Sequence, residues 1–341
     1  MKKIKKNSII ILILTLVLLF FMLRHDYKNI AYWLVNCNKL YLILAIVVYF
    51  ISVIIDSTSF YMIIKQYSNS YKFKDTLSLN IMTKFFNGVT PLSSGGQPLQ
   101  VYELYKNNIN LNDATNIVVQ FFIIYQIAMV IFSTVAVILN RVFKIFVKNL
   151  FIRKLVILGY VINVIVLLIL FLVSLNRKFN IKVITFIIKV LSKLKIIKNK
   201  DKLISKWELK CENFYNSAQI LKKNWTVLIK GTIIQIIQLL FLYSIPLLIS
   251  MAIYDSVNMD LLNSLVASSY VYLIGSYIIV PGATGGIEYG FMKLFSNFLK
   301  KKSLMSATIL WRFITYYLPV ILGAIAFNIA KRKNGMEDFE E

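Results

Sequence analysis

The sequence predicts an all-α polytopic membrane protein with about eight transmembrane helices, a re-entrant hairpin and a possible internal repeat. Apolar residues make up 58% of the 341 residues, which is more than the roughly half that is usual in soluble domains. Several windows of about 20 residues are nearly uncharged, the length that crosses a hydrocarbon core about 30 Å thick. Two breaks rich in glycine and proline, one in each half of the chain, share one sequence pattern.

The apolar windows indicate one integral membrane domain at residues 1–335, followed by an acidic tail at 336–341. The first window follows the basic start "MKKIKKN" and no small-residue cleavage site comes after it, so we expect a retained span rather than a signal peptide. Basic flanks mark the cytoplasmic side, which places the N-terminus in the cytoplasm. The eight predicted spans are residues 8–23, 41–64, 114–139, 155–175, 227–250, 261–280, 282–299 and 304–330.

The segment at residues 76–105 is less apolar than the spans around it and contains Lys84 and the first break. It fits a re-entrant hairpin better than a complete crossing. Irregular backbone at membrane depth is tolerated only where it is buried in protein or lines a wet cavity. The hairpin therefore predicts such a cavity.

The loop at residues 176–225 carries thirteen Lys and Arg residues against three acidic ones, so we expect it to be cytoplasmic. Within it Lys182, Lys189 and Lys193 share one helical face opposite apolar residues, a pattern typical of helices that lie on anionic lipid. The alternative is an ordinary cytoplasmic helix packed on the protein. We attribute the net charge of +24 to membrane topology rather than to DNA binding.

The basic cluster "KRK" at residues 331–333 places the C-terminus in the cytoplasm too, in a multi-pass protein of a bacterial cytoplasmic membrane. The bias toward Ile, Lys and Asn is typical of an AT-rich bacterial genome. With eight spans, however, "KKK" at residues 300–302 falls outside, against the same charge rule. Only the removal of one span resolves that conflict.

The two breaks read "TPLSSGGQPL" at residues 90–99 and "VPGATGGIEY" at residues 280–289, and both follow the frame Pro-x-x-[Ser/Thr]-Gly-Gly. Glycine permits left-handed backbone and proline removes a helical donor, so each break should unwind a helix and free backbone groups for a ligand. Interrupted apolar segments in two corresponding halves are typical of transporter sites. A helix restarting after each Gly-Gly pair would offer an anion site, and lipid phosphate is the expected anion. The alternative is that the breaks only punctuate short loops.

Ionisable residues inside membrane spans are costly and are treated as functional by default. The candidates here are Asp56, Glu103, Glu288 and Arg312. Arg312 lies well inside an apolar helix and needs a carboxylate or a phosphate, and we expect Glu288 to be its partner. The alternatives are that Arg312 snorkels to an interface and that Asp56 caps a polar helix contact.

Catalytic and metal-binding patterns are absent from the sequence. His25 is the only histidine, which excludes most histidine triads and metal sites, and Cys37 and Cys211 lie far apart. A P-loop is missing as well. We therefore expect no cofactor, no metal and no ATP-hydrolysing site.

The motifs "TPLSSGGQPLQVYEL", "VPGATGGIEYGF" and "WRFITYYLPVILG" resemble the lysylphosphatidylglycerol synthase transmembrane family of flippase-like integral membrane proteins. The resemblance implies an eight-span module that moves aminoacylated phosphatidylglycerol between leaflets. In full-length synthases a cytosolic domain transfers lysine from lysyl-tRNA to the lipid. This sequence leaves no room for that domain after the membrane module, which argues against transferase activity although the family is named for it, and whether the protein is an enzyme stays open.

The same resemblance implies a set of substrate-binding positions in the two breaks and the last span. The Gly-Gly amides are assigned to a headgroup phosphate, and Glu103 or Glu288 to a cationic headgroup or to Arg312. The set consists of Pro91, Gly95, Gly96, Gln97, Glu103, Pro281, Gly282, Gly285, Gly286, Glu288 and Arg312.

The sequence thus favours a lipid translocase for phosphatidylglycerol, its lysylated form or a related anionic lipid, linked to envelope lipid modification and to resistance to cationic peptides. One alternative is a phosphatidylglycerol lysyltransferase, which would need a tRNA-reading domain supplied by a separate transferase chain as partner or by the basic loop. A further alternative is a carrier for glycans linked to polyprenyl phosphate. A purely structural membrane partner is the remaining interpretation.

Overall fold

The computed structural model confirms an all-helical membrane protein over the residues that it describes. These are residues 32–33, 35–146, 150–175, 222–254 and 259–337, with a few single positions between 176 and 221. The predicted first span at 8–23, most of the basic loop at 176–225 and the last four residues of the acidic tail lie outside the described residues.

Five long apolar helices in the described part of the chain can cross a membrane by length and composition. Four are single helices, and the fifth runs through three consecutive elements because a π-helical turn joins two α-helices without a break. They confirm the spans predicted at 41–64, 114–139, 155–175, 227–250 and 304–330. The elements are α3 (Lys39–Ile64), α6 (Leu111–Phe143), α7 (Leu150–Leu175), α10 (Trp225–Ala252), and α13 (Lys301–Arg312) with η3 (Phe313–Tyr317) and α14 (Leu318–Glu337).

The predicted count of eight crossings is not confirmed, because the region 261–299 forms two short helices. These are α11 (Leu261–Gly275) and α12 (Gly286–Phe295), joined through the single turn η2 (Pro281–Ala283). With 15 and 10 residues and a rise of about 1.5 Å per residue, each is shorter than a core about 30 Å thick. The two helices pack against each other.

The region 76–105 has the same plan in the first half of the chain. Helix α4 (Phe73–Val89) ends before Pro91, the turn η1 (Pro91–Ser93) follows, and α5 (Gly96–Lys106) returns against α4. Proline ends α4 because it lacks a backbone N–H and restricts the residue before it. A helix, a turn and a helix are therefore present where the hairpin was predicted, although a re-entrant position in the membrane stays a prediction.

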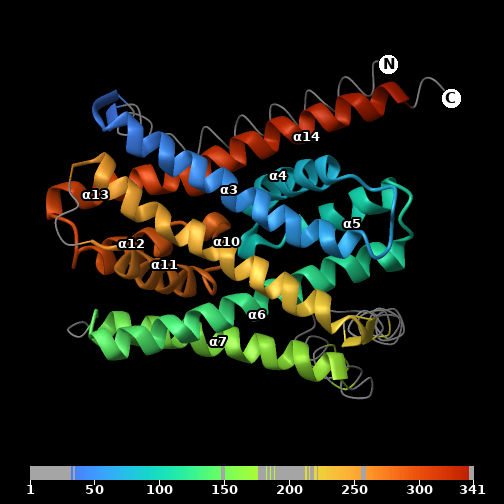
Figure 1. Ribbon diagram of the computed structural model, residues 1–341, viewed down its shortest axis with the longest axis horizontal. Coiled ribbons are helices and arrows are strands. Elements are labelled where there is room, and N and C mark those ends of the chain that lie inside the picture. Colours follow the sequence, from blue (N-terminus) through green and yellow to red (C-terminus); the bar gives the residue numbers. More distant parts are fainter. Residues whose placement is uncertain are drawn as a thin grey trace.

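Figure 1 shows how these two helical pairs are placed in the bundle. Helices α3 and α10 lie side by side along it, and α6 with α7 forms one of its edges. The pair α4 and α5 lies toward the end where α3 finishes, while α11 and α12 lie toward the opposite end. The turns η1 and η2 contact each other between them.

Helix α14 lies closely against α4 because glycine faces the contact. A Cβ on Gly323 would lie 2.5 Å from the carbonyl oxygen of Ile81 and 2.8 Å from the amide nitrogen of Phe85. A Cβ on Gly88 would lie 2.4 Å from Val320 Cγ2. Small residues at helix contacts in membranes allow such backbone approach, and this contact holds the last long helix beside the first break.

We expect Gly323→Ala to destabilise the protein because the backbone atoms of α4 cannot yield to a methyl group as a flexible side chain would. Overpacking of this kind lowers the free energy of unfolding by about 1–3 kcal/mol. Thermal unfolding in detergent should show a lower midpoint for Gly323→Ala than for the control Ile325→Val, which changes an exposed position of α14. Equal midpoints would contradict the close contact.

Candidate functional site

The two breaks adopt the same backbone turn, which extends their sequence similarity to structure. In the first, Leu92 and Ser93 both have φ 53°, and in the second Gly282 has φ 62° and Ala283 φ 53°. The hydroxyl of Ser94 donates to the Pro91 carbonyl at 2.9 Å, and Thr284 donates to the Pro281 carbonyl at the same distance. The shared frame therefore begins both breaks with the same turn, and the backbones diverge after it, since ψ is −12° at Ser94 and 140° at Thr284.

Tyr316 connects the two breaks at the point where they meet. Its hydroxyl donates to the carbonyl of Gly88, just before the first break, at 3.0 Å. Its ring lies against the second break so closely that a Cβ on Gly282 would be 2.3 Å from the ring. A side chain at position 282 would have to displace that ring, and the left-handed φ of the position favours glycine as well.

Arg312 lies buried beside this contact, with 5% of its surface exposed. Its Nε is 2.6 Å from Oε1 of Glu288, so the predicted ion pair is confirmed. Its Nη2 donates to the carbonyl of Gly282 at 3.1 Å and to the hydroxyl of Thr284 at 3.4 Å. The guanidinium carbon lies 3.9 Å from the ring centroid of Tyr316, a cation–π contact. Arg312 therefore does not snorkel to an interface.

Three local features surround the pair. Glu288 is in the first turn of α12, and its second oxygen accepts the amide of Gly285 at 2.6 Å, so its carboxylate caps the helix while it pairs with Arg312. Arg312 is the last residue before the π-helical turn η3, a rare feature often found at functional sites. Trp311 stacks on Phe291 with centroids 4.6 Å apart, which packs α13 against α12.

Three of the four glycine amides that were assigned to a phosphate already donate to side chains. Gly95 donates to Thr90 Oγ1 at 2.8 Å and Gly96 to Asn87 Oδ1 at 2.9 Å, and Gly285 donates to Glu288. A phosphate bound to these amides would have to replace those bonds. Their role in substrate binding therefore stays a prediction, while Arg312 is the cation that the fold brings to the breaks.

The other predicted site residues lie at different distances from Arg312. Pro91 and Gln97 are exposed at the first break, and Gly286 packs on Ile278 at the second. Glu103 is partly buried about two turns along α5, and it is Glu288 rather than Glu103 that pairs with Arg312. The structure thus groups Pro281, Gly282, Gly285, Glu288 and Arg312, and it places Glu103 apart.

The structure contains a second ion pair, of which the sequence indicated only the carboxylate, Asp56. Asp56 of α3 lies 2.8 Å from the ammonium of Lys84 on α4. Its carboxylate also accepts the amides of Asn80 at 3.1 Å and of Gln235, on α10, at 3.0 Å. Asn80 and Lys84 are four residues apart and share one face of α4, so both reach Asp56. No signal in the sequence identified Lys84 as the partner.

These two groups can hold charge but offer little for bond-making chemistry. Each contains one cation and one carboxylate within an apolar bundle. Across the described residues there is also no cluster of three His, Cys, Asp or Glu side chains that could hold a metal ion. The arrangement is suited to recognising a charged group that enters the bundle.

Comparison with known proteins assigns the chain to a family. The sequence model of the lysylphosphatidylglycerol synthase TM region matches residues 8–323. The chain belongs to this family. A relative, the UPF0104 membrane protein MJ1595 of Methanocaldococcus jannaschii, is 30% identical over 346 residues, which cover 97% of this chain and 97% of the relative. Together with its five long apolar helices, family membership identifies a multi-pass membrane protein and confirms the resemblance seen in the sequence.

We expect Glu288→Gln to destabilise this family member because it leaves the Arg312 charge buried without a carboxylate. Breaking one side of a buried pair costs roughly 3–5 kcal/mol of unfolding free energy, read as a lower thermal midpoint in detergent. Lys293→Gln, an exposed position on the same helix, should change it by less than about 0.5 kcal/mol.

The double variant Glu288→Gln/Arg312→Met tests whether the loss in Glu288→Gln comes from the unpaired charge of Arg312. It removes both charges, so it should recover part of the stability that Glu288→Gln loses. The single variant Arg312→Met completes the cycle. If the double variant loses as much stability as Glu288→Gln and Arg312→Met lose together, the ion pair does not couple these residues.

Proposed function

We propose that this protein is a lipid translocase that moves phosphatidylglycerol, its lysylated form or a related anionic lipid between the leaflets of a bacterial cytoplasmic membrane. The observation that carries the proposal is the buried Arg312–Glu288 pair at the contact of the two breaks. A cation and a carboxylate held together at that depth are costly, and such residues typically serve a transported group.

The chemistry of the pair suits a lipid headgroup. A guanidinium has five N–H donors in a planar fork that matches phosphate oxygens, and here it lies next to the exposed Thr284 and Gly285. Glu288 is 20% exposed along its side chain, so it is accessible to the amine of a lysylated headgroup. One headgroup could thus contact both members of the pair.

The positions of the two breaks suit a path across the membrane. We propose that α4–η1–α5 and α11–η2–α12 are re-entrant hairpins that enter from opposite sides and meet at their turns. Residues 91–94 are exposed although they lie at this meeting point. Irregular, exposed backbone inside a membrane requires a wet cavity, and in transporters such interrupted helices line the substrate site.

The same proposal accounts for a role in the cell envelope. A lysylated headgroup that reaches the outer leaflet adds positive charge to that surface, which repels cationic peptides within about a Debye length. On this view lysine transfer itself belongs to a separate transferase chain, the partner that supplies the lipid.

Proteoliposomes that contain fluorescent phosphatidylglycerol, or its lysylated form, test the translocase directly. Dithionite bleaches only outer-leaflet label, so the slow phase of bleaching measures movement between leaflets. We expect Arg312→Lys and Glu288→Gln to slow that movement at least tenfold, because Lys lacks the planar fork and Gln lacks the charge. The control Lys293→Gln should match the parent protein.

Two results would decide between a translocase, a transferase and a purely structural role for the breaks. Equal rates in protein-free vesicles and in all variants would overturn the translocase, and they would leave the breaks as structural turns. Lysine incorporation into phosphatidylglycerol by the purified protein given lysyl-tRNA would instead establish the transferase alternative. Folding of each variant is checked by its elution as a single peak in detergent.

A further inference from the structure

The surroundings of Asp56 leave one buried polar atom without a partner. Gln235 of α10 is fully buried, and its amide nitrogen donates to Oδ1 of Asp56 at 3.0 Å. The oxygen of the same amide has no hydrogen-bond partner among the described residues. A buried acceptor without a donor is costly. A second ligand beside the carboxylate would account for it.

We propose that Asp56, Asn80 and Gln235 form a binding site for one alkali-metal cation, which exchanges with the ammonium of Lys84. Rotation of the Gln235 amide by half a turn would bring its oxygen to Oδ1 of Asp56. Two acceptor oxygens that face each other repel unless a cation lies between them. The unpartnered oxygen is therefore the ligand that this cation would use.

The groups around the carboxylate suit a hard monovalent cation. Asn80 of α4 donates to Oδ2 at 3.1 Å, so its amide can turn in the same way as that of Gln235. Carboxylate, amide and water oxygens are the ligands of hard cations, and one carboxylate matches a single positive charge. The ammonium of Lys84 and the two amides stabilise the ionised carboxylate, which favours a metal cation over a proton.

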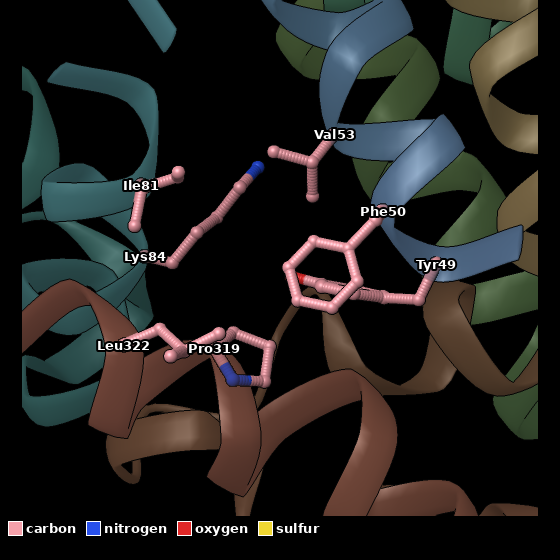
Figure 2. Close-up of a pocket in the computed structure, with 7 residues that line it drawn as sticks. All are labelled: Tyr49, Phe50, Val53, Ile81, Lys84, Pro319 and Leu322. Atoms are coloured by element: carbon pink, nitrogen blue, oxygen red, sulfur yellow. The ribbon is translucent and has the colours of Figure 1, made fainter. Parts of the chain in front are cut away.

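Lys84 has room to leave the carboxylate. Its Nζ lies 2.8 Å from Oδ2 of Asp56, and its side chain is 29% exposed whereas that of Asp56 is 10% exposed. Figure 2 shows Lys84 reaching from α4 toward α3 in a small hollow, which Phe50 and Pro319 also line. The hollow has room for about one water molecule. A displaced ammonium can thus stay hydrated while the cation takes the carboxylate.

The site differs from the metal centres that the sequence argues against. Those centres need several His, Cys, Asp or Glu ligands, and the described part of the chain holds no such cluster. Transporters bind sodium through carbonyl oxygens near the substrate site. A single carboxylate with amide oxygens is enough for a cation of this kind.

Helix α4 connects the proposed cation site to the two breaks. Lys84 and Gly88 are one turn apart on it, and the Gly88 carbonyl accepts the hydroxyl of Tyr316 at 3.0 Å. The ring of Tyr316 lies 3.9 Å from the guanidinium carbon of Arg312. Because the chain carries no P-loop, a cation gradient would supply the energy for lipid movement. This consequence rests on the proposed function, whereas cation binding does not.

Thermal unfolding of the detergent-purified full chain tests the site, with sodium chloride replaced by choline chloride at constant total chloride. A ligand that binds only the folded state raises the unfolding midpoint. We expect a rise of roughly 2–4 °C for each tenfold increase in sodium concentration above the dissociation constant. Choline has no affinity for a site of this size, so it serves as the reference cation.

Gln235→Met removes the unpartnered oxygen and keeps both charges, so it should abolish the sodium response. The matched control is Gln238→Met. Gln238 lies on the same helix, is 7% exposed and also has an unpartnered amide oxygen, but it is not one of the three groups that contact the carboxylate. It should keep the response. The double variant Asp56→Asn/Lys84→Met leaves no charge unpaired and should lose the response as well.

The proposal is overturned if the parent protein unfolds at the same midpoint in sodium and in choline, if Gln235→Met keeps the sodium response, or if Gln238→Met loses it as fully as Gln235→Met. A protein that responds to sodium without moving lipid would contradict the translocase alone. A protein that moves lipid without responding to sodium would contradict the cation site alone.

Discussion

The pairing of Arg312 with Glu288 is the interaction on which the centre of the structure depends. A guanidinium inside an apolar bundle cannot stay charged without a partner, because its loss of hydration costs several kcal/mol. Glu288 supplies the charge, and the Gly282 carbonyl and the Tyr316 ring complete the surroundings. Since Glu288 begins α12 and Arg312 ends α13, neutralising the charge also fixes the second break against the last long helix.

The first half of the chain meets the same constraint with different elements. Asp56 and Lys84 neutralise each other between α3 and α4, and Gln235 ties the carboxylate to α10. Lys84 and Gly88 are one turn apart on α4, and the Gly88 carbonyl accepts the hydroxyl of Tyr316. The contact of α4 with α14 therefore connects the two ion pairs, and the glycine at position 323 keeps that contact close.

Much of the fold was predictable because apolar length alone identifies a helix that can cross a bilayer. The five long helices were found in this way, and proline and glycine located both turns. The two crossings predicted within residues 261–299 are not confirmed, since hydropathy alone does not separate a short apolar helix such as α11 from a full span. The charge conflict at Lys300 to Lys302 does not signal this, because removing two crossings leaves those residues on the same side.

The sequence by itself determined which charged residues needed a partner and where the helices had to break. Asp56 and Arg312 are charges in apolar spans, so each had to have a partner, and the frame Pro-x-x-[Ser/Thr]-Gly-Gly had to break a helix twice. Only the tertiary structure decided that Lys84 pairs with Asp56, that Glu103 stays apart, and that the two breaks touch through Tyr316. Those choices depend on which helices lie side by side, and packing between distant segments is not encoded in local hydropathy or spacing.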